Sequence, residues 1–123
     1  LTVVLRRRGM GRAGFQMTAR HAEGEAPGAQ AGTLRALDER VAVVSHQGTL
    51  YAQHTASGSQ LSGGDTAVWR VEWTAPPAAA GAVVFHLAGN AADGDGSQLG
   101  DHVYTATASV TPPRTIPVRK DTP

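Results

Sequence analysis

Cysteine is absent from the 123 residues of the chain. This absence excludes disulfides, thiolate zinc sites and a covalently attached c-type haem, because each of them needs a cysteine sulfur. The sequence also lacks a run of about 18 apolar residues, the length that a membrane-spanning helix needs. We therefore expect no membrane span in this chain, and any membrane association would come through a partner or a further segment.

Charge is scarce as well, with 17% charged residues and a net charge of +1. Such a balance gives no electrostatic basis for binding nucleic acid. The 15 glycines, the 7 prolines and the short apolar runs favour an all-β chain over a helical one. A chain of this length forms one domain around a single hydrophobic core.

The stretch from Trp69 to Tyr104 organises the rest of the sequence. Trp69 and Trp73 alternate with polar residues, so a strand places both indoles on one face. A proline turn follows, since proline has no amide proton for a central ladder. A second strand over 82–88 then turns Phe85 inward. Together with alternation elsewhere, this unit predicts a core that contains Phe15, Trp69, Trp73, Phe85 and Tyr104.

Short connections and alternating patterns predict six further strands, over 1–5, 14–20, 33–37, 41–45, 49–54 and 104–110. Strands of this number and length form an antiparallel two-sheet β-sandwich. We place the domain at 1–111, followed by a proline-containing tail at 112–123. The opening at Leu1, without a methionine or a signal peptide, indicates a processed or trimmed piece.

An ordered set of segments extends from the first strand to about Val110. The set comprises 14–19 (GFQMTA), 51–55 (YAQHT), 69–76 (WRVEWTAP), 84–85 (VF), 88–96 (AGNAADGDG), 100–101 (GD) and 104–105 (YT). In this order they resemble bacterial Reeler-like domains, the "choice-of-anchor V" domains of exported proteins. The resemblance implies an immunoglobulin-like β-sandwich outside the cytoplasm, in the periplasm or at the cell surface.

Many bacterial relatives in that family carry a haem-binding Cys-x-x-Cys-His segment upstream and a sorting anchor or transmembrane helix downstream. Neither segment occurs in these 123 residues, and the disulfides of the animal Reeler domains are absent too. The resemblance brings no catalytic residues with it. His54 matches the family's Tyr-x-x-His-Thr segment. It is either a functional residue, as an axial ligand to a haem carried elsewhere or a polar group of a ligand site, or a structural histidine whose ring bonds the backbone.

The glycine-rich stretch before the last strand resembles a calcium loop without its full twelve-residue pattern. Carboxylates on a glycine-bent backbone can gather oxygen ligands around one cation. The alternative is a hairpin loop whose aspartates bond backbone amides. The residues concerned are Asn90, Asp93, Asp95 and Asp101.

Basic residues cluster near the start of the domain and in the tail, and they either contact an acidic partner or form a solvated surface. They are Arg6, Arg7, Arg8 and Arg12 near the start, and Arg114, Arg119 and Lys120 in the tail. The region 46–62 is a third candidate contact surface.

No nucleophile elbow, phosphate loop, zinc helix or dinucleotide fingerprint occurs in the sequence. We therefore expect a non-catalytic binding or scaffolding module that packs on a larger membrane-associated or cell-surface assembly through a protein partner. The alternative is a redox accessory domain that shields or ligates a haem belonging to a neighbouring segment or subunit.

Overall fold

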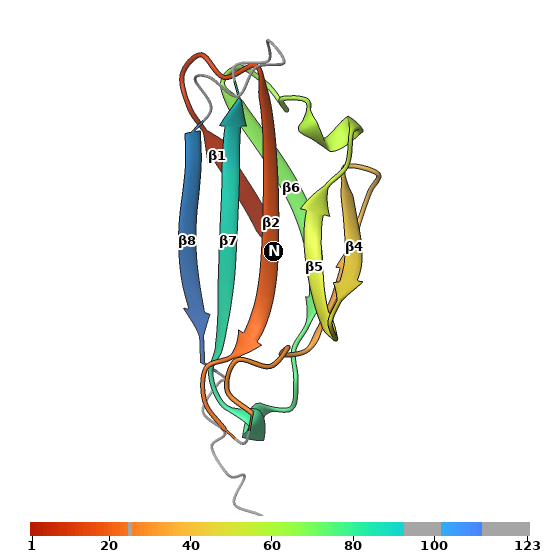
Figure 1. The fold of residues 1–123 in the computed structure, drawn as a ribbon, viewed down its shortest axis with the longest axis vertical. Coiled ribbons are helices and arrows are strands. Elements are labelled where there is room, and N and C mark those ends of the chain that lie inside the picture. Colours follow the sequence, from red (N-terminus) through yellow and green to blue (C-terminus); the bar gives the residue numbers. More distant parts are fainter. Residues whose placement is uncertain (25, 93–101, 112–123) are drawn as a thin grey trace, which may run out of the picture.

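The computed structural model describes residues 1–24, 26–92 and 102–111. Over these residues the chain is all-β, with two antiparallel sheets and two 3₁₀ turns at Ser57–Ser59 and Ala78–Ala80 (Figure 1). The predicted all-β, two-sheet architecture is thereby confirmed. No helix in this described part is long and apolar enough to cross a membrane.

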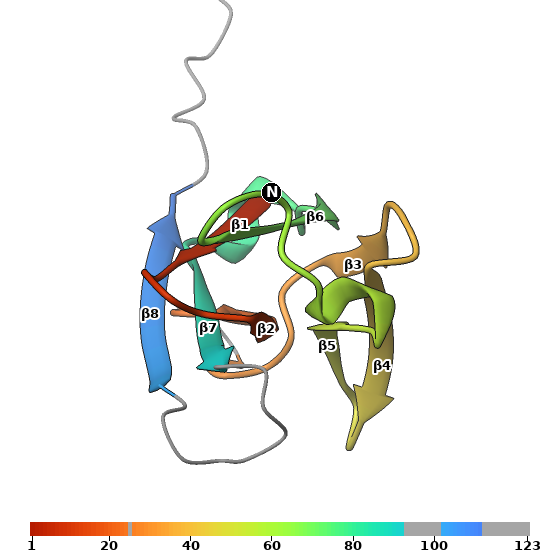
Figure 2. The same cartoon turned by 90° about the horizontal axis from the view of Figure 1, so that it is seen from above.

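The smaller sheet has three strands in the order β1-β6-β3, and the larger has five in the order β4-β5-β2-β7-β8. Figure 2 shows β1, β6 and β3 lying over the larger sheet. The strand bounds are β1 Thr2–Arg6, β2 Arg12–His21, β3 Thr33–Ala36, β4 Val41–His46, β5 Thr49–His54, β6 Thr66–Thr74, β7 Val83–Ala92 and β8 His102–Val110.

Pairing is uneven along the five-stranded sheet. The ladder between β2 and β7 runs from Arg12↔Ala92 to His21↔Val83, and β7 pairs with β8 from Val83↔Val110 to Ala91↔His102. Between β2 and β5 the register holds only Gln16↔Gln53 and Met17↔Ala52. The β4–β5 hairpin is therefore joined to the rest of its sheet by a short seam.

Alternate residues of β2, β6 and β7 fill the space between the sheets, as strand geometry requires. The Phe15 ring lies 4.7 Å from that of Trp69, and the Trp73 ring meets that of Phe85 edge-on at 4.8 Å, both between ring centroids. Trp69 is 1% exposed, whereas Trp73 is partly buried at the edge of the core. The two indoles share a face, as the alternation predicts.

The buried indole of Trp69 has a fixed hydrogen-bond partner. Its Nε1–H donates to the Gly58 carbonyl oxygen at 2.8 Å. The Arg40 guanidinium holds the same turn by donating to the carbonyl oxygens of Gly58 (3.2 Å) and Gln60 (2.9 Å). Gly58 itself must be glycine, because a Cβ there would lie 2.0 Å from the Arg40 carbonyl oxygen.

Two details of the sequence-based prediction are wrong. Tyr104 is not in the core: it is 40% exposed on β8, because the three-stranded sheet does not cover that strand. Asn90 does not belong to a loop: it lies in β7, paired with Gly14 on one side and Val103 on the other. Pairing with the long strand β2 keeps β7 extended through Asn90 to Ala92, although the small residues there are typical of a turn in sequence.

Replacing Trp69 with alanine should lower the free energy of unfolding by about 3–5 kcal/mol, since the change empties the centre of the core. Trp73→Ala should cost less because that side chain is already partly exposed. Urea denaturation of both variants measures the difference, with Arg70→Ala on the exposed face of the same strand as control. Equal losses for the two tryptophans would contradict this description of the core.

Candidate functional site

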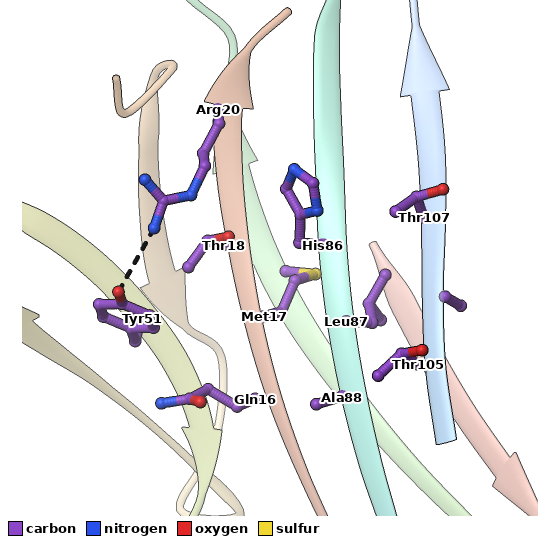
Figure 3. A pocket seen from close by; sticks show the side chains of 11 residues that line it. Gln16, Met17, Thr18, Arg20, Tyr51, His86, Leu87, Ala88, Thr105 and Thr107 are labelled. Carbon is purple, nitrogen blue, oxygen red and sulfur yellow. Dashed lines mark hydrogen bonds between the residues drawn. The ribbon is translucent and has the colours of Figure 1, made fainter. Parts of the chain in front are cut away.

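A groove of about 800 Å³ crosses the outer face of the five-stranded sheet, the face turned away from the core. The lining comes from four strands, β2, β5, β7 and β8, and its outward-facing side chains alternate along each strand (Figure 3). The register aligns them in two rows: Thr18, His86 and Thr107 in one, and Gln16, Ala88 and Thr105 in the other. Tyr51 of β5 completes the lining beyond β2.

The Tyr51 side of the groove is fixed by Arg20. The Arg20 guanidinium donates to the Tyr51 hydroxyl at 3.3 Å and to the Gly28 carbonyl oxygen at 2.8 Å, so it ties β5 to the loop that follows β2 (Figure 3). Both side chains are half-buried. Arg20 therefore positions the aromatic ring, and its charge is already engaged with neutral oxygens.

Apart from Arg20, the polar groups of the lining are neutral, and they lie among the apolar side chains of Met17, Leu87, Ala88 and Ala106. Arg20 is the one formally charged residue among those that line the groove, and no carboxylate is among them. Thr18 is 5% exposed and is the buried polar residue of the described chain, yet its hydroxyl makes none of the side-chain hydrogen bonds found there. A buried hydroxyl without a protein partner remains available to a ligand group that reaches it.

Two side chains extend the short seam between β2 and β5. At one end, the Gln30 side chain accepts a hydrogen bond from the Leu50 amide at 2.7 Å and donates to the Gly32 carbonyl oxygen at 2.7 Å. At the other end, Nδ1 of His54 accepts from the Phe15 amide at 3.0 Å. These side chains satisfy backbone groups that the missing strand pairs would otherwise leave without partners.

His54 can approach the backbone only because residue 14 is glycine. A Cβ on Gly14 would lie 2.5 Å from Cε1 of the imidazole and 2.8 Å from its Nδ1. The ring thus covers Gly14, and both residues line a second hollow of about 370 Å³ next to the groove. This contact joins two segments of the sequence pattern, 14–19 and 51–55, which the sequence alone does not bring together.

The contacts of His54 bear on its two interpretations. Its Nδ1 also lies 3.3 Å from the Phe15 carbonyl oxygen, so the ring is held against the backbone of one residue. A histidine that accepts an amide proton at Nδ1 carries its own proton on Nε2 when neutral, and that nitrogen then has no lone pair for iron. The geometry favours the structural interpretation, and haem ligation by His54 stays a prediction.

The basic residues of the first turn lie together at one end of the molecule. Arg6 donates to the Thr66 hydroxyl at 3.3 Å, and Arg7 bonds both the Tyr104 hydroxyl and Nε2 of His102, the latter at 2.9 Å. Arg8 and Arg12 are exposed. The three basic residues of the tail, Arg114, Arg119 and Lys120, lie outside the described residues.

The predicted calcium site falls mostly outside the description too. Asp93, Asp95 and Asp101 are not among the described residues, and Asn90 is an exposed residue of β7. Within 1–24, 26–92 and 102–111, no group of three or more His, Asp or Glu side chains could hold a metal ion. The calcium hypothesis is therefore untested by this structure.

Comparison with known proteins adds no assignment: no family model, curated protein or solved structure matches the chain. The resemblance to Reeler-like domains accordingly remains a prediction from sequence.

The contact between Gly14 and His54 can be measured by a double-mutant cycle. Gly14→Ala should destabilise the protein by about 1–3 kcal/mol, because the new methyl group displaces the imidazole. In a His54→Ala background the same substitution should cost less by about 1 kcal/mol or more, since the space is then vacant. Urea denaturation of the four proteins gives the coupling energy. Strictly additive effects would show that the ring does not rest on Gly14.

Proposed function

We propose that the chain is a non-catalytic binding module that seats a segment of a protein partner in the outer-face groove. The observation that supports this proposal is the groove itself, a wide and shallow surface on which amide, hydroxyl, imidazole and phenol groups lie among apolar side chains such as Met17 and Leu87. These groups can pair with the backbone and the polar side chains of a partner. They do not form the paired acid and base, or the activated nucleophile, that catalysis requires.

The rigidity of the floor supports this proposal. The groove lies on the continuous β2–β7–β8 ladder, and Tyr51 is held by Arg20. A surface that is already ordered loses little conformational entropy when a partner binds. Protein interfaces also favour aromatic and arginine side chains over lysine and acidic ones, and the groove contains Tyr51 and Arg20 but no carboxylate.

The finer fold assignment and the cellular location belong to the same proposal. Neighbouring strands that are distant in sequence, such as β2 with β7 and β1 with β6, are typical of Greek-key sandwiches, and immunoglobulin-like domains are one class of these. An extracytoplasmic accessory domain or subunit of a larger assembly is the role that fits such a module. This location rests on the resemblance to Reeler-like domains.

The redox alternative depends on His54 and on haem carried by another segment. For His54 to ligate iron, its Nε2 would need a free lone pair, and Nδ1 would then have to give up the Phe15 amide proton and donate to the Phe15 carbonyl oxygen instead. No described contact favours this tautomer over the one with the shorter 3.0 Å bond. The binding module is therefore the function that we put forward.

Site-specific photo-crosslinking in the cells that make the protein tests the proposal. With p-benzoylphenylalanine at position 16, which lines the groove, irradiation should yield one discrete adduct that contains a second protein. The same probe at position 72, on the exposed face of the three-stranded sheet, is the control. Mass spectrometry of the adduct identifies the partner and the crosslinked segment.

A groove-filling substitution makes the test specific. Ala88 lies directly opposite Gln16, so Ala88→Trp should occupy the groove and reduce the yield of the adduct roughly tenfold, a loss of about 1.4 kcal/mol in binding. The melting temperature of this variant shows whether the fold is intact. An adduct that forms equally well from position 72, or that persists in folded Ala88→Trp, would refute binding in the groove.

A further inference from the structure

Strand β8, His102–Val110, is exposed along its entire length. All nine of its residues are exposed, including Val103 at 72%, Tyr104 at 40% and Val110 at 40%. It forms one edge of the five-stranded sheet, and within the described part of the chain it pairs only with β7. One row of its backbone amides and carbonyls therefore faces solvent.

The two ends of the larger sheet differ in how they are covered. At the opposite end, β3 packs on β4 and β5 and closes that side of the sandwich. At the β8 end the smaller sheet stops at β1, which touches β7 (Figure 2). Within the described residues, the inward-facing side chains of β8, including Tyr104 and Ala106, consequently have no strand of the smaller sheet beyond β1 to cover them, although Arg7 reaches the Tyr104 hydroxyl.

The sequence of β8 carries none of the usual protection of an edge strand. Natural edges are blunted by charged residues such as lysine, by proline or by a bulge, all of which discourage pairing with another strand. The segment HVYTATASV has no lysine, arginine, aspartate, glutamate, proline or glycine. Its ladder with β7 is continuous through nine residue pairs, without a bulge that would twist the edge away.

We infer that β8 pairs with β8 of a second copy of this chain, antiparallel and about a two-fold axis at Ala106. This register keeps inward-facing residues opposite inward-facing ones over the full strand. It sets the large Tyr104 against the small Ala108 of the second copy, and Thr105 against Thr107. The strand has no formal charge, so two copies brought edge to edge do not repel each other.

The pairing also places two grooves side by side. Thr105 and Thr107 line the outer-face groove and lie on the strand that would form the interface. A two-fold axis perpendicular to the sheet keeps both outer faces on the same side. The dimer therefore presents one continuous outer face that carries both grooves, although the pairing itself does not depend on what the groove binds.

The chain has no native cysteine, so single cysteines report this geometry directly. In Ala106→Cys the two thiols would meet at the axis, where opposite Cα atoms in a non-hydrogen-bonded pair lie about 4.5 Å apart, close enough for a disulfide. In Val110→Cys the two thiols would lie about 26 Å apart along the strands. Under mild oxidation, Ala106→Cys should form covalent dimer at roughly ten times the rate of Val110→Cys, since only the first pair has disulfide geometry.

Sedimentation equilibrium of the cysteine-free protein supplies the second measurement. The full chain should self-associate in a concentration-dependent way. Ala106→Lys should abolish this association, because two ammonium groups would face each other at the axis. Val44→Lys on β4, which adds the same charge to an exposed position at the other edge of the sheet, should leave it intact.

Three outcomes would overturn the inference. Equal rates of disulfide formation at positions 106 and 110 would mean random collision. Equal loss of association in the two lysine variants would place the interface elsewhere. A wild-type protein that stays monomeric at every concentration would mean that β8 does not pair with a second copy and is left for a strand of a different protein.

Discussion

The hydrogen bond from the Trp69 indole to the Gly58 carbonyl is the contact on which the sandwich depends. An indole can be buried between two sheets only if its N–H finds an acceptor there, because an unpaired buried donor costs about 1–3 kcal/mol. The acceptor comes from a turn between β5 and β6, and Arg40 holds that turn by bonding its carbonyl oxygens. This one hydrogen bond thus links the inward face of β6, in the smaller sheet, to the turn that follows β5 of the larger sheet.

Much of the fold could be predicted from alternation. The pattern around Phe15, Trp69 and Phe85 assigns each ring to an inward face, and the structure confirms all three. The same rule fails for Tyr104, because alternation tells which residues share a face but not whether another sheet covers that face. It also fails at Asn90, where pairing with a long neighbour extends a strand through residues that favour turns.

The candidate site was less accessible to sequence reasoning. Gln16, Thr18 and Arg20 show a polar alternation that marks an outward face, yet nothing in the sequence indicates that His86 and Thr107 fall in the same row. That alignment is a property of strand register, which is set by long-range packing. The role of Gly14 was likewise invisible, since the imidazole that rests on it belongs to His54, on a strand that comes much later in the chain.

The short seam between β2 and β5 has a mechanical consequence. Two backbone pairs, with one side chain at each end of the seam, join the β4–β5 hairpin to the rest of the larger sheet. The hairpin is therefore the part of that sheet that can tilt with the smallest loss of hydrogen bonds. Tyr51 lies on this hairpin, whereas His86 and Thr107 lie on β7 and β8. A tilt at the seam would therefore change the distance between Tyr51 and the row formed by His86 and Thr107, and it would have to break the Arg20–Tyr51 hydrogen bond. In hydrogen exchange, the amides of the seam would open independently of the long β2–β7 ladder, so that local opening at the seam adjusts the groove without unfolding the core.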